Sequence, residues 1–301
     1  MVLVFGTVCI DRVRRVEFLP SEGGYVEIQE QFNVLGGEAA NTANALRQWG
    51  IDCELWGNSI GEGIEASVLK GLLEEKGLVN RVASTHIAPP TPVCDVFVTP
   101  GGERTMFGHG FSKMDLGVDA SKVPFGQGIW FTAEGNMRIA AATAARLACQ
   151  AGMRLYLMDY VNPSEVPTGA FWQCSTDWVG TRSNTQKNVA WVQEWVAKTG
   201  TFAILSDGPN GFVAGSAETP VRAYPPYPAP LVVDTTGAGD MFRAGMLYSL
   251  TQDWPIHRCL QFASAAGCLK CRALGATTDV PTVSEIVAHI DAHPSVTQQY
   301  S

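Results

Sequence analysis

Short apolar runs, rich in β-branched residues, alternate with amphipathic helical patterns along most of this 301-residue chain. Such alternation is typical of βαβ units, in which crossover helices join parallel strands. The apolar runs predict strands at 2–10, 52–57, 128–132, 153–159, 176–180 and 202–206. The helical patterns predict helices at 38–49, 63–76, 137–151 and 184–199. The sequence therefore predicts an α/β fold with a doubly wound, mostly parallel sheet flanked by helices.

The last third of the chain follows this alternation less regularly. It predicts an antiparallel strand with Pro and Gly turns over 210–223, and helices near 240–251, 255–272 and 282–293. Domains usually span roughly 100–200 residues, so this length permits one large domain or two smaller ones. No repeat, charge run or low-complexity stretch appears, and we expect a single domain over 1–301.

Two stretches interrupt the βα alternation, at 14–34 and 91–111, and each alternates apolar and polar residues around a Gly-containing turn. This pattern is typical of hairpins that leave the main sheet. We interpret them as a small β lid over a site, with plain edge strands as the alternative. Apolar lid strands would bury well against a second copy, so we expect a homodimer formed through the lid.

The charge balance limits the possible partners. The net charge is −8, with only 21 Lys and Arg spread along the chain, which argues against a nucleic-acid partner. No apolar run reaches the ~18 residues of a transmembrane helix, and the N-terminal residues lack the features of a signal peptide, so no membrane partner is expected. The eight scattered cysteines favour a reducing cytoplasm, and Cys268 and Cys271 lack the second pair of a zinc site.

The most informative segment is VDTTGAGDMFRAG at 233–245. Gly237, Ala238 and Gly239 are small enough for backbone N–H groups to converge at the start of a helix, which makes an anion hole without basic side chains. Asp240 follows in the first helical turn, where a carboxylate can accept a proton from an incoming hydroxyl during phosphoryl transfer. For GAGD alone, the alternative is a Gly-rich turn with the aspartate as a helix cap.

A second segment, GGEAANTANALRQWG at 36–50, opens a helix with two glycines. Gly36 and Gly37 would let the backbone approach a ligand closely, and Asn41 offers both a donor and an acceptor, which suits a polyol. Asp11, at the end of the first predicted strand, could accept two hydroxyl hydrogen bonds from a sugar. The alternatives are a tight turn with solvent-facing asparagines, and an exposed loop aspartate.

Several common motifs are missing. The chain has neither a Walker A sequence nor a GxGxxG after a strand, so the phosphate-binding parts of P-loop and Rossmann dinucleotide proteins are absent. It also has no GxSxG elbow and no HExxH zinc motif.

The segments at 36–50 and 233–245 resemble the two signatures of the ribokinase (PfkB-type) carbohydrate kinase family. FGTVCID, the two lid stretches, ILSDGPNGFVAG at 204–215 and the final GATTDVPTVSEI also fall in the family's order, so the resemblance spans nearly the whole chain. It implies a ribokinase-like α/β domain with a β lid that transfers the γ-phosphoryl group of ATP to a hydroxymethyl group. It also implies catalytic roles for Asp240, Gly237, Ala238 and Gly239, and substrate-binding roles for Asp11, Gly36, Gly37, Asn41 and Glu134.

The resemblance further implies a nucleotide site and bound cations. The residues that match the family's nucleotide-binding positions are Asn184, Lys187, Ser206, Gly208 and Gly211. Asp234 and Thr236 match positions that in some members contribute to a monovalent-cation site, such as one for K+, and Mg2+ is expected to arrive with ATP. The chain departs from the family at Lys187, where Asn-x-x-Glu usually ends in glutamate. A lysine cannot support hydrated magnesium as a glutamate does, although it could neutralise phosphate charge.

Two other functions remain open at this point. One is a catalytically silent sugar or nucleoside sensor on the same scaffold, which Lys187 favours and the intact Asp240 disfavours. The other is a kinase for a nucleoside or vitamin precursor, because Phe32 and Phe107 in the lid could stack on a base. The identity of the alcohol stays open, since a one-residue change of register would exchange the two faces of the lid.

Overall fold

The computed structural model describes residues 1–82, 89–126 and 129–301. In this part of the chain, nine strands form one sheet. Across the sheet they are β13 Arg222–Tyr224, β12 Phe212–Gly215, β11 Phe202–Ser206, β10 Phe171–Ser175, β9 Arg154–Met158, β8 Trp130–Glu134, β1 Val2–Gly6, β4 Cys53–Gly57 and β5 Asn80–Val82. All neighbours from β11 to β5 pair in parallel, whereas β12 and β13 are antiparallel, as the Pro- and Gly-containing segment 210–223 predicted.

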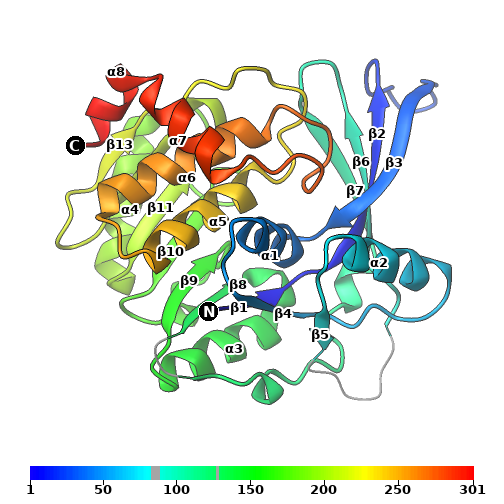
Figure 1. Cartoon of the computed structure of the whole chain (residues 1–301), viewed down its shortest axis with the longest axis horizontal. Helices are drawn as coiled ribbons and strands as arrows, with labels where there is room; N and C mark the ends of the chain where they lie inside the picture. The colour runs from blue at the N-terminus through cyan, green and yellow to red at the C-terminus, as the bar shows by residue number, and fades with distance from the viewer. Residues whose placement is uncertain (83–88, 127–128) are drawn as a thin grey trace.

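Helices cover both faces of this sheet (Figure 1). They are α1 Glu38–Gln48, α2 Ile64–Glu75, α3 Arg138–Gln150, α4 Thr185–Thr199, α5 Ala238–Thr251, α6 Ile256–Lys270, α7 Val283–Asp291 and α8 Pro294–Thr297. Alternate residues of β1 point to opposite faces: Val2 and Val4 join the core with α1, α2, α5, α6 and α7, and Leu3 and Phe5 join the core with α3 and α4. Burial on both faces explains why β1 is continuously apolar, and the predicted doubly wound fold is confirmed.

A second sheet stands at one side of the molecule (Figure 1). Its order is β3-β2-β6-β7, from the strands β2 Cys9–Val16, β3 Ile28–Gly36, β6 Val93–Val98 and β7 Arg104–His109. β2 and β3 form one antiparallel hairpin, β6 and β7 form another, and β2 pairs with β6 in parallel. The stretches 14–34 and 91–111 thus leave the main sheet as predicted, and the second sheet extends back to Cys9.

The predicted helices at 38–49, 63–76, 137–151 and 184–199 agree with α1 to α4 within one residue at each end. Two strand predictions were wrong. The run 2–10 is two strands, because Gly6 has a φ of 149° and the chain passes there from the main sheet into β2 of the second sheet.

The predicted strand at 176–180 is a turn, in which the amides of Trp178 and Val179 donate to the carbonyl of Ser175. The strand lies just before it, where the side chains of Trp172, Gln173 and Cys174 are buried. The sequence also gave no signal for the short, polar β5. Of the predicted strand 128–132, residue 128 lies outside the described residues.

Over the described ranges, no helix is long and apolar enough to cross a bilayer. All eight cysteines are free thiols, and the Cys268 thiol donates to the carbonyl of Tyr227 at 2.8 Å. No metal-binding group of three or more His, Cys, Asp and Glu side chains occurs in the same part of the chain. Cys271 is buried, and Cys268 is half-buried.

Candidate active site

The predicted functional segments meet near one edge of the main sheet. β1 ends at Gly6, β8 at Glu134 and β11 at Ser206, and because these strands run in parallel, their carboxyl ends share one edge. Ligands of open α/β sheets bind at this edge. Helices α1 and α5 pack against each other, and the Asn41 side chain of α1 contacts Asp240 of α5 there.

The turn that begins α5 leaves several amides unpaired. Gly237 adopts the left-handed conformation, with φ 80° and ψ 3°, and Gly239 is exposed. Among the described residues, the amides of Gly237, Gly239 and Asp240 have no hydrogen-bond acceptor, whereas the Ala238 amide donates to the Thr235 carbonyl at 3.2 Å. Unpaired amides at a helix N-terminus are a suitable anion-binding site.

Asp240 lies in the first turn of α5 and is 7% exposed. Its Oδ2 accepts a hydrogen bond from Asn41 Nδ2 at 2.8 Å, and its Oδ1 lies 3.6 Å from Nη2 of Arg243. Burial raises the pKa of Asp240, while the Arg243 charge and the Asn41 hydrogen bond oppose this rise. Within the described structure, Oδ1 has no hydrogen-bond partner and can accept a proton.

The paired glycines before α1 make room for protein groups. A Cβ on Gly36 would lie 2.2 Å from the Asp11 carboxyl carbon, and one on Gly37 would lie 2.3 Å from the Thr7 carbonyl oxygen. Because Gly36 has no side chain, the Asp11 carboxylate can lie against its backbone. The close approach that this glycine permits is therefore between two parts of the protein. Close approach to a ligand, as the sequence suggested, stays a prediction.

Two buried carboxyl groups flank this region. Asp11 is 5% exposed and accepts a hydrogen bond from the Cys9 thiol at 3.4 Å, and burial raises its pKa to about 7. Glu134 accepts hydrogen bonds from the amide and hydroxyl of Thr7, both at 2.5 Å, and burial raises its pKa to about 7. Gly6 lets Glu134 fit, because a Cβ there would lie 1.6 Å from Glu134 Oε2.

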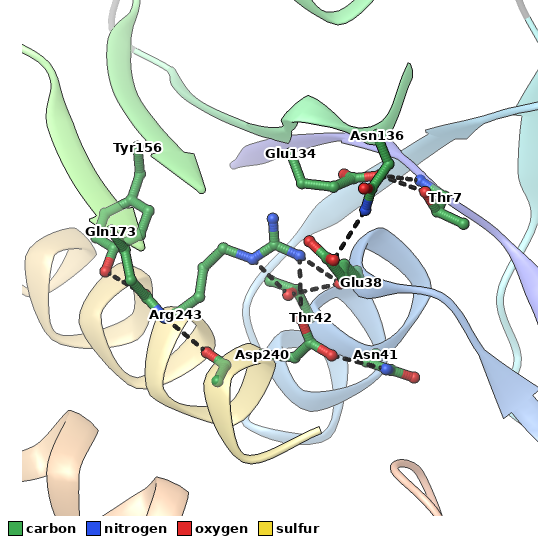
Figure 2. A network of polar contacts seen from close by, with 11 residues as sticks. Thr7, Glu38, Asn41, Thr42, Glu134, Asn136, Tyr156, Gln173, Asp240 and Arg243 are labelled. Atoms are coloured by element: carbon green, nitrogen blue, oxygen red, sulfur yellow. Dashed lines mark hydrogen bonds and ion pairs between the residues drawn. The ribbon is translucent and has the colours of Figure 1, made fainter. Parts of the chain in front are cut away.

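Sequence reasoning missed Arg243, which is fully buried beside Asp240 (Figure 2). Its Nε donates to Thr42 Oγ1 at 2.8 Å, and its Nη2 donates to the Glu38 carbonyl. Because Arg243 follows Asp240 by three residues in α5, the two side chains lie on one face of the helix. The three-residue spacing was the sequence signal that could have pointed to Arg243. To use it, one would have had to know that this face of α5 packs against α1.

Further polar contacts support the site from neighbouring elements (Figure 2). Gln173 Nε2 donates to the Gly239 carbonyl at 3.0 Å, and the Tyr156 hydroxyl donates to Gln173 Oε1 at 2.7 Å. Asn136 Nδ2 donates to Glu38 Oε1 at 2.8 Å. These contacts link the first turn of α5 to β10 and β9, and the start of α1 to the segment after β8.

The predicted nucleotide residues form a neighbouring loop. Gly208 and Gly211 adopt positive φ values of 53° and 87°, and a Cβ on Gly211 would lie 2.2 Å from the Tyr224 carbonyl oxygen. Ser206 Oγ donates to the Cys174 carbonyl at 3.2 Å. Asp207, which the sequence did not single out, accepts hydrogen bonds from Thr176 Oγ1 at 2.8 Å and from the Ser183 amide at 2.9 Å. It thereby ties this loop to the segment before α4.

Asn184 and Lys187 lie at the start of α4. Asn184 is the N-cap, and its Oδ1 accepts a hydrogen bond from the Lys187 amide at 3.1 Å. Lys187 is exposed, so its ammonium group can approach an anion from solvent. The N-cap role of Asn184 was not predicted, although Asn is a favoured N-cap residue.

Asp234 and Thr236 lie together in the turn before α5. Asp234 Oδ1 accepts hydrogen bonds from the Thr236 amide at 2.8 Å and hydroxyl at 2.6 Å, and Oδ2 accepts one from the Gly275 amide at 2.7 Å. Lys270, also fully buried, donates to the Ala273 carbonyl at 3.2 Å. Burial lowers the pKa of Lys270, and the charge of Asp234 opposes this decrease.

The second sheet contacts this same turn. Arg104 Nη1 of β7 donates to Thr235 Oγ1 at 2.8 Å, and the Thr235 amide donates to the Gly102 carbonyl at 3.3 Å. The hairpin of β6 and β7 therefore lies beside the turn before α5, where a lid over the candidate site would have to be.

Comparison with known proteins agrees with this arrangement. Residues 1–283 match the family described as pfkB family carbohydrate kinase. The chain is 29% identical to an uncharacterized sugar kinase of Dictyostelium discoideum, over 94% of this chain and 95% of that protein. It is 26% identical to an ATP-dependent ribose-1-phosphate kinase of Halopiger xanaduensis, over 96% and 97% of the two chains. The structure of a ribokinase from Giardia lamblia superposes with a TM-score of 0.78 at 15% identity, over 97% and 99% of the chains.

Proposed function

The chain belongs to the pfkB family of carbohydrate kinases, and on that premise we propose that Asp240 is the general base of an ATP-dependent transfer to a sugar-like alcohol. The substrate hydroxyl oxygen forms a bond to the γ-phosphorus of ATP, and the bond from that phosphorus to the β,γ-bridging oxygen breaks. ADP leaves with the electron pair of that bond, and the hydroxyl proton passes to the Asp240 carboxylate.

One observation carries this proposal. Asp240 lies in the first turn of α5, where the amides of Gly237, Gly239 and Asp240 have no acceptor within the described residues and its own Oδ1 has no hydrogen-bond partner. Such amides bind the transferred phosphate and stabilise its charge, while the carboxylate receives the proton. The buried Asn41 holds the carboxylate in place from α1.

A coupled assay of ATP consumption tests the function. We expect turnover when the purified protein is screened against ribose, fructose, 2-keto-3-deoxygluconate, nucleosides and sugar phosphates. Phosphate should appear on the substrate in equal amount to the ADP formed. A protein that binds one of these compounds and ATP, yet forms no product, would instead be a sensor.

The substrate-binding residues proposed are Asp11, Gly36, Gly37, Asn41 and Glu134. Ionised Asp11 offers lone pairs only, so it binds two sugar hydroxyls best when it carries no proton. Because its pKa is raised to about 7, its ionised fraction increases by about tenfold from pH 6 to pH 8. We therefore expect KM for the sugar to fall by a similar factor over this range, measured at saturating ATP.

The Asp11→Asn variant checks the assignment, since its sugar KM should be high and nearly independent of pH. A folded-state pKa above the ordinary 3.8 adds stability that is present at low pH and is lost as pH rises through about 7. At pH 8 this variant should therefore be more stable than the original protein, on the order of 1–3 kcal/mol. Asp95→Asn on strand β6, where Asp95 pairs with Arg14, is the control. If Asp11→Asn keeps the full pH dependence of the sugar KM, then Asp11 does not bind the sugar.

ATP is the second substrate, and the residues proposed to bind it are Asn184, Lys187, Ser206, Gly208 and Gly211. Mg2+ neutralises charge between the β- and γ-phosphates when it is bound. No cluster of three or more metal-binding side chains lies in the described ranges, and Asn184 Oδ1 is occupied as the N-cap, so these residues fit a metal that is held mainly by the nucleotide.

Metal removal should distinguish a metal that arrives with the nucleotide from one that the protein itself holds. We expect EDTA to abolish turnover, because uncompensated phosphate charge opposes the transfer. EDTA should leave the melting temperature of the nucleotide-free protein unchanged, because few protein groups hold the metal. A large loss of stability on adding EDTA, measured by differential scanning fluorimetry, would indicate a resident metal instead.

The resemblance implies a K+ site at Asp234 and Thr236, which the surroundings of these two residues do not favour. Both Asp234 carboxylate oxygens already accept internal hydrogen bonds, and Asp234 also interacts electrostatically with the buried side chain of Lys270. These residues therefore fit a further cation poorly. We expect turnover in choline buffer to be close to that in K+ buffer.

A nucleoside or vitamin-precursor kinase is the second candidate activity. Phe107 of β7 is 59% exposed and packs edge-to-face on Phe97, so it offers an aromatic surface on the second sheet. Phe32, by contrast, packs in the small core of that sheet. If Phe107→Ala weakens binding of a nucleoside but not of a free sugar, the aromatic surface has this role.

We also propose a homodimer formed through the lid. Met106, Phe107 and Ile28 are exposed apolar residues on the strands of the second sheet. Burial of such residues against a second copy would cover them, and a monomeric mass in analytical ultracentrifugation would contradict this. The eight free thiols favour a reducing, cytoplasmic location, which cell fractionation tests.

A further inference from the structure

Arg243 carries a charge that is completely removed from solvent. Its exposed fraction is 0%, and a buried guanidinium needs acceptors to offset the loss of hydration. Its acceptors lie on α1, where Nε binds Thr42 Oγ1 at 2.8 Å and Nη2 binds the Glu38 carbonyl. Nη1 has no hydrogen-bond partner among the described residues. The side chain therefore crosses from α5 to α1 (Figure 2).

This crossing passes beside the proposed base. Nη2 lies 3.6 Å from Asp240 Oδ1, and both groups are buried. Asp240 Oδ2 is held separately by Asn41, which is also on α1. The carboxylate thus has one oxygen fixed by a neutral amide and the other beside a fixed positive charge, with both partners anchored to α1.

We infer that Arg243 is a positioning residue, which holds the Asp240 carboxylate toward α1 and keeps it ionised for proton abstraction. The inference rests on the proposed role of Asp240 as the base. Arg243 does not itself touch the reacting atoms. Its role is to place a positive charge beside Oδ1, which favours the deprotonated form.

The electrostatic surroundings of Asp240 come from several elements. Positive charge faces it from Arg243 on α5 and Arg104 on β7, and both lower its pKa against the increase caused by burial. Acidic groups and one thiol that interact with Asp240 from the other elements are Cys9 and Asp11 on β2, Glu38 on α1 and Asp159 after β9. Since Asp240 has so many acidic neighbours, and Arg243 is the cation that lowers its pKa most, loss of Arg243 should raise the pKa of Asp240.

The pH dependence of kcat/KM tests this, because its acid limb reports the base in the free enzyme. We expect Arg243→Gln to move this limb upward by about one pH unit or more, since an opposite charge this near lowers a carboxyl pKa by about 1–3 units. Activity should therefore fall at least about tenfold at low pH and recover toward pH 9. Arg243→Lys keeps the charge without the planar fork, so the limb should return close to its original position while kcat stays reduced.

If Arg243→Gln does not fold, a smaller change to one of the acceptors of Arg243 can be tested instead. Thr42→Val removes the Nε acceptor, keeps the volume and should move the acid limb in the same direction by a smaller amount. Ser249→Ala is the matched control, because it removes a buried hydroxyl from the same helix, which bonds only to backbone carbonyls within α5. It should leave the limb in place.

Two results would overturn the inference. One is a loss of activity in Arg243→Gln that is equal at every pH, and the other is an unmoved acid limb in both Arg243→Gln and Thr42→Val. If the proposed function itself is wrong, the result differs from both of these: the original protein consumes no ATP with any alcohol. The pH profiles of the variants are therefore compared only once the original protein is shown to be active.

Discussion

Replacement of Asp240 with asparagine is expected to lower kcat by about 10²–10⁴-fold, the usual contribution of a general base. Asparagine has nearly the same shape and can still accept the hydrogen bond from Asn41 Nδ2 through its amide oxygen. It cannot take the proton of the substrate hydroxyl. Sugar and nucleotide should therefore bind with nearly unchanged dissociation constants, and only the transfer step should slow.

The measurement pairs steady-state ATP consumption with calorimetric titration of sugar and nucleotide. The control is Asp234→Asn in the same turn, where the carboxylate accepts backbone and hydroxyl hydrogen bonds and has no free oxygen. We expect this control to lose stability, seen as a lower melting temperature. Turnover of Asp240→Asn near that of the original protein would remove Asp240 from the role of base.

The fold was predictable because its two main signals are local. Buried parallel strands such as β1 are continuously apolar, and helices such as α1 and α3 have a clear periodicity, so both types could be identified from neighbours in the chain. The strand at 176–180 was misplaced for the opposite reason. Its apolar residues follow a turn that bonds back to Ser175, and only pairing with β9 and β11 shows that the strand is 171–175.

The site was predictable where a motif is contiguous, and less so where partners come from distant segments. The turn before Asp240 follows from the small residues of GAGD, but the acceptors of Arg243 lie about 200 positions away on α1. Gly36 shows a related limit. The sequence suggested space for a ligand, whereas the nearest atoms to its missing Cβ are those of Asp11. Such pairings depend on tertiary packing, which no local pattern reveals.

Two glycines in the turn that begins α5, where we propose that phosphate binds, differ in their surroundings. A Cβ on Gly239 would have only Gln173 Nε2 nearby, at 3.9 Å, and would otherwise extend into open space. Gly239 lies in the first turn of α5 and has no positive φ, so alanine should stabilise the fold by about 0.5–1 kcal/mol. The same methyl group would stand where a phosphate must approach the unpaired amides.

We therefore expect Gly239→Ala to melt at or above the original temperature, yet to lose about 10²–10³-fold in kcat/KM for ATP, as removal of anion-hole donors does. Gly237→Ala is the matched variant, because Gly237 has a φ of 80° and its Cβ would lie 2.7 Å from the Cβ of Ala276. It should lose about 1–2 kcal/mol of stability together with activity. Thermal melts and initial rates of both variants separate folding from phosphate binding. A Gly239→Ala protein with normal stability and normal kcat/KM would show that phosphate is bound elsewhere.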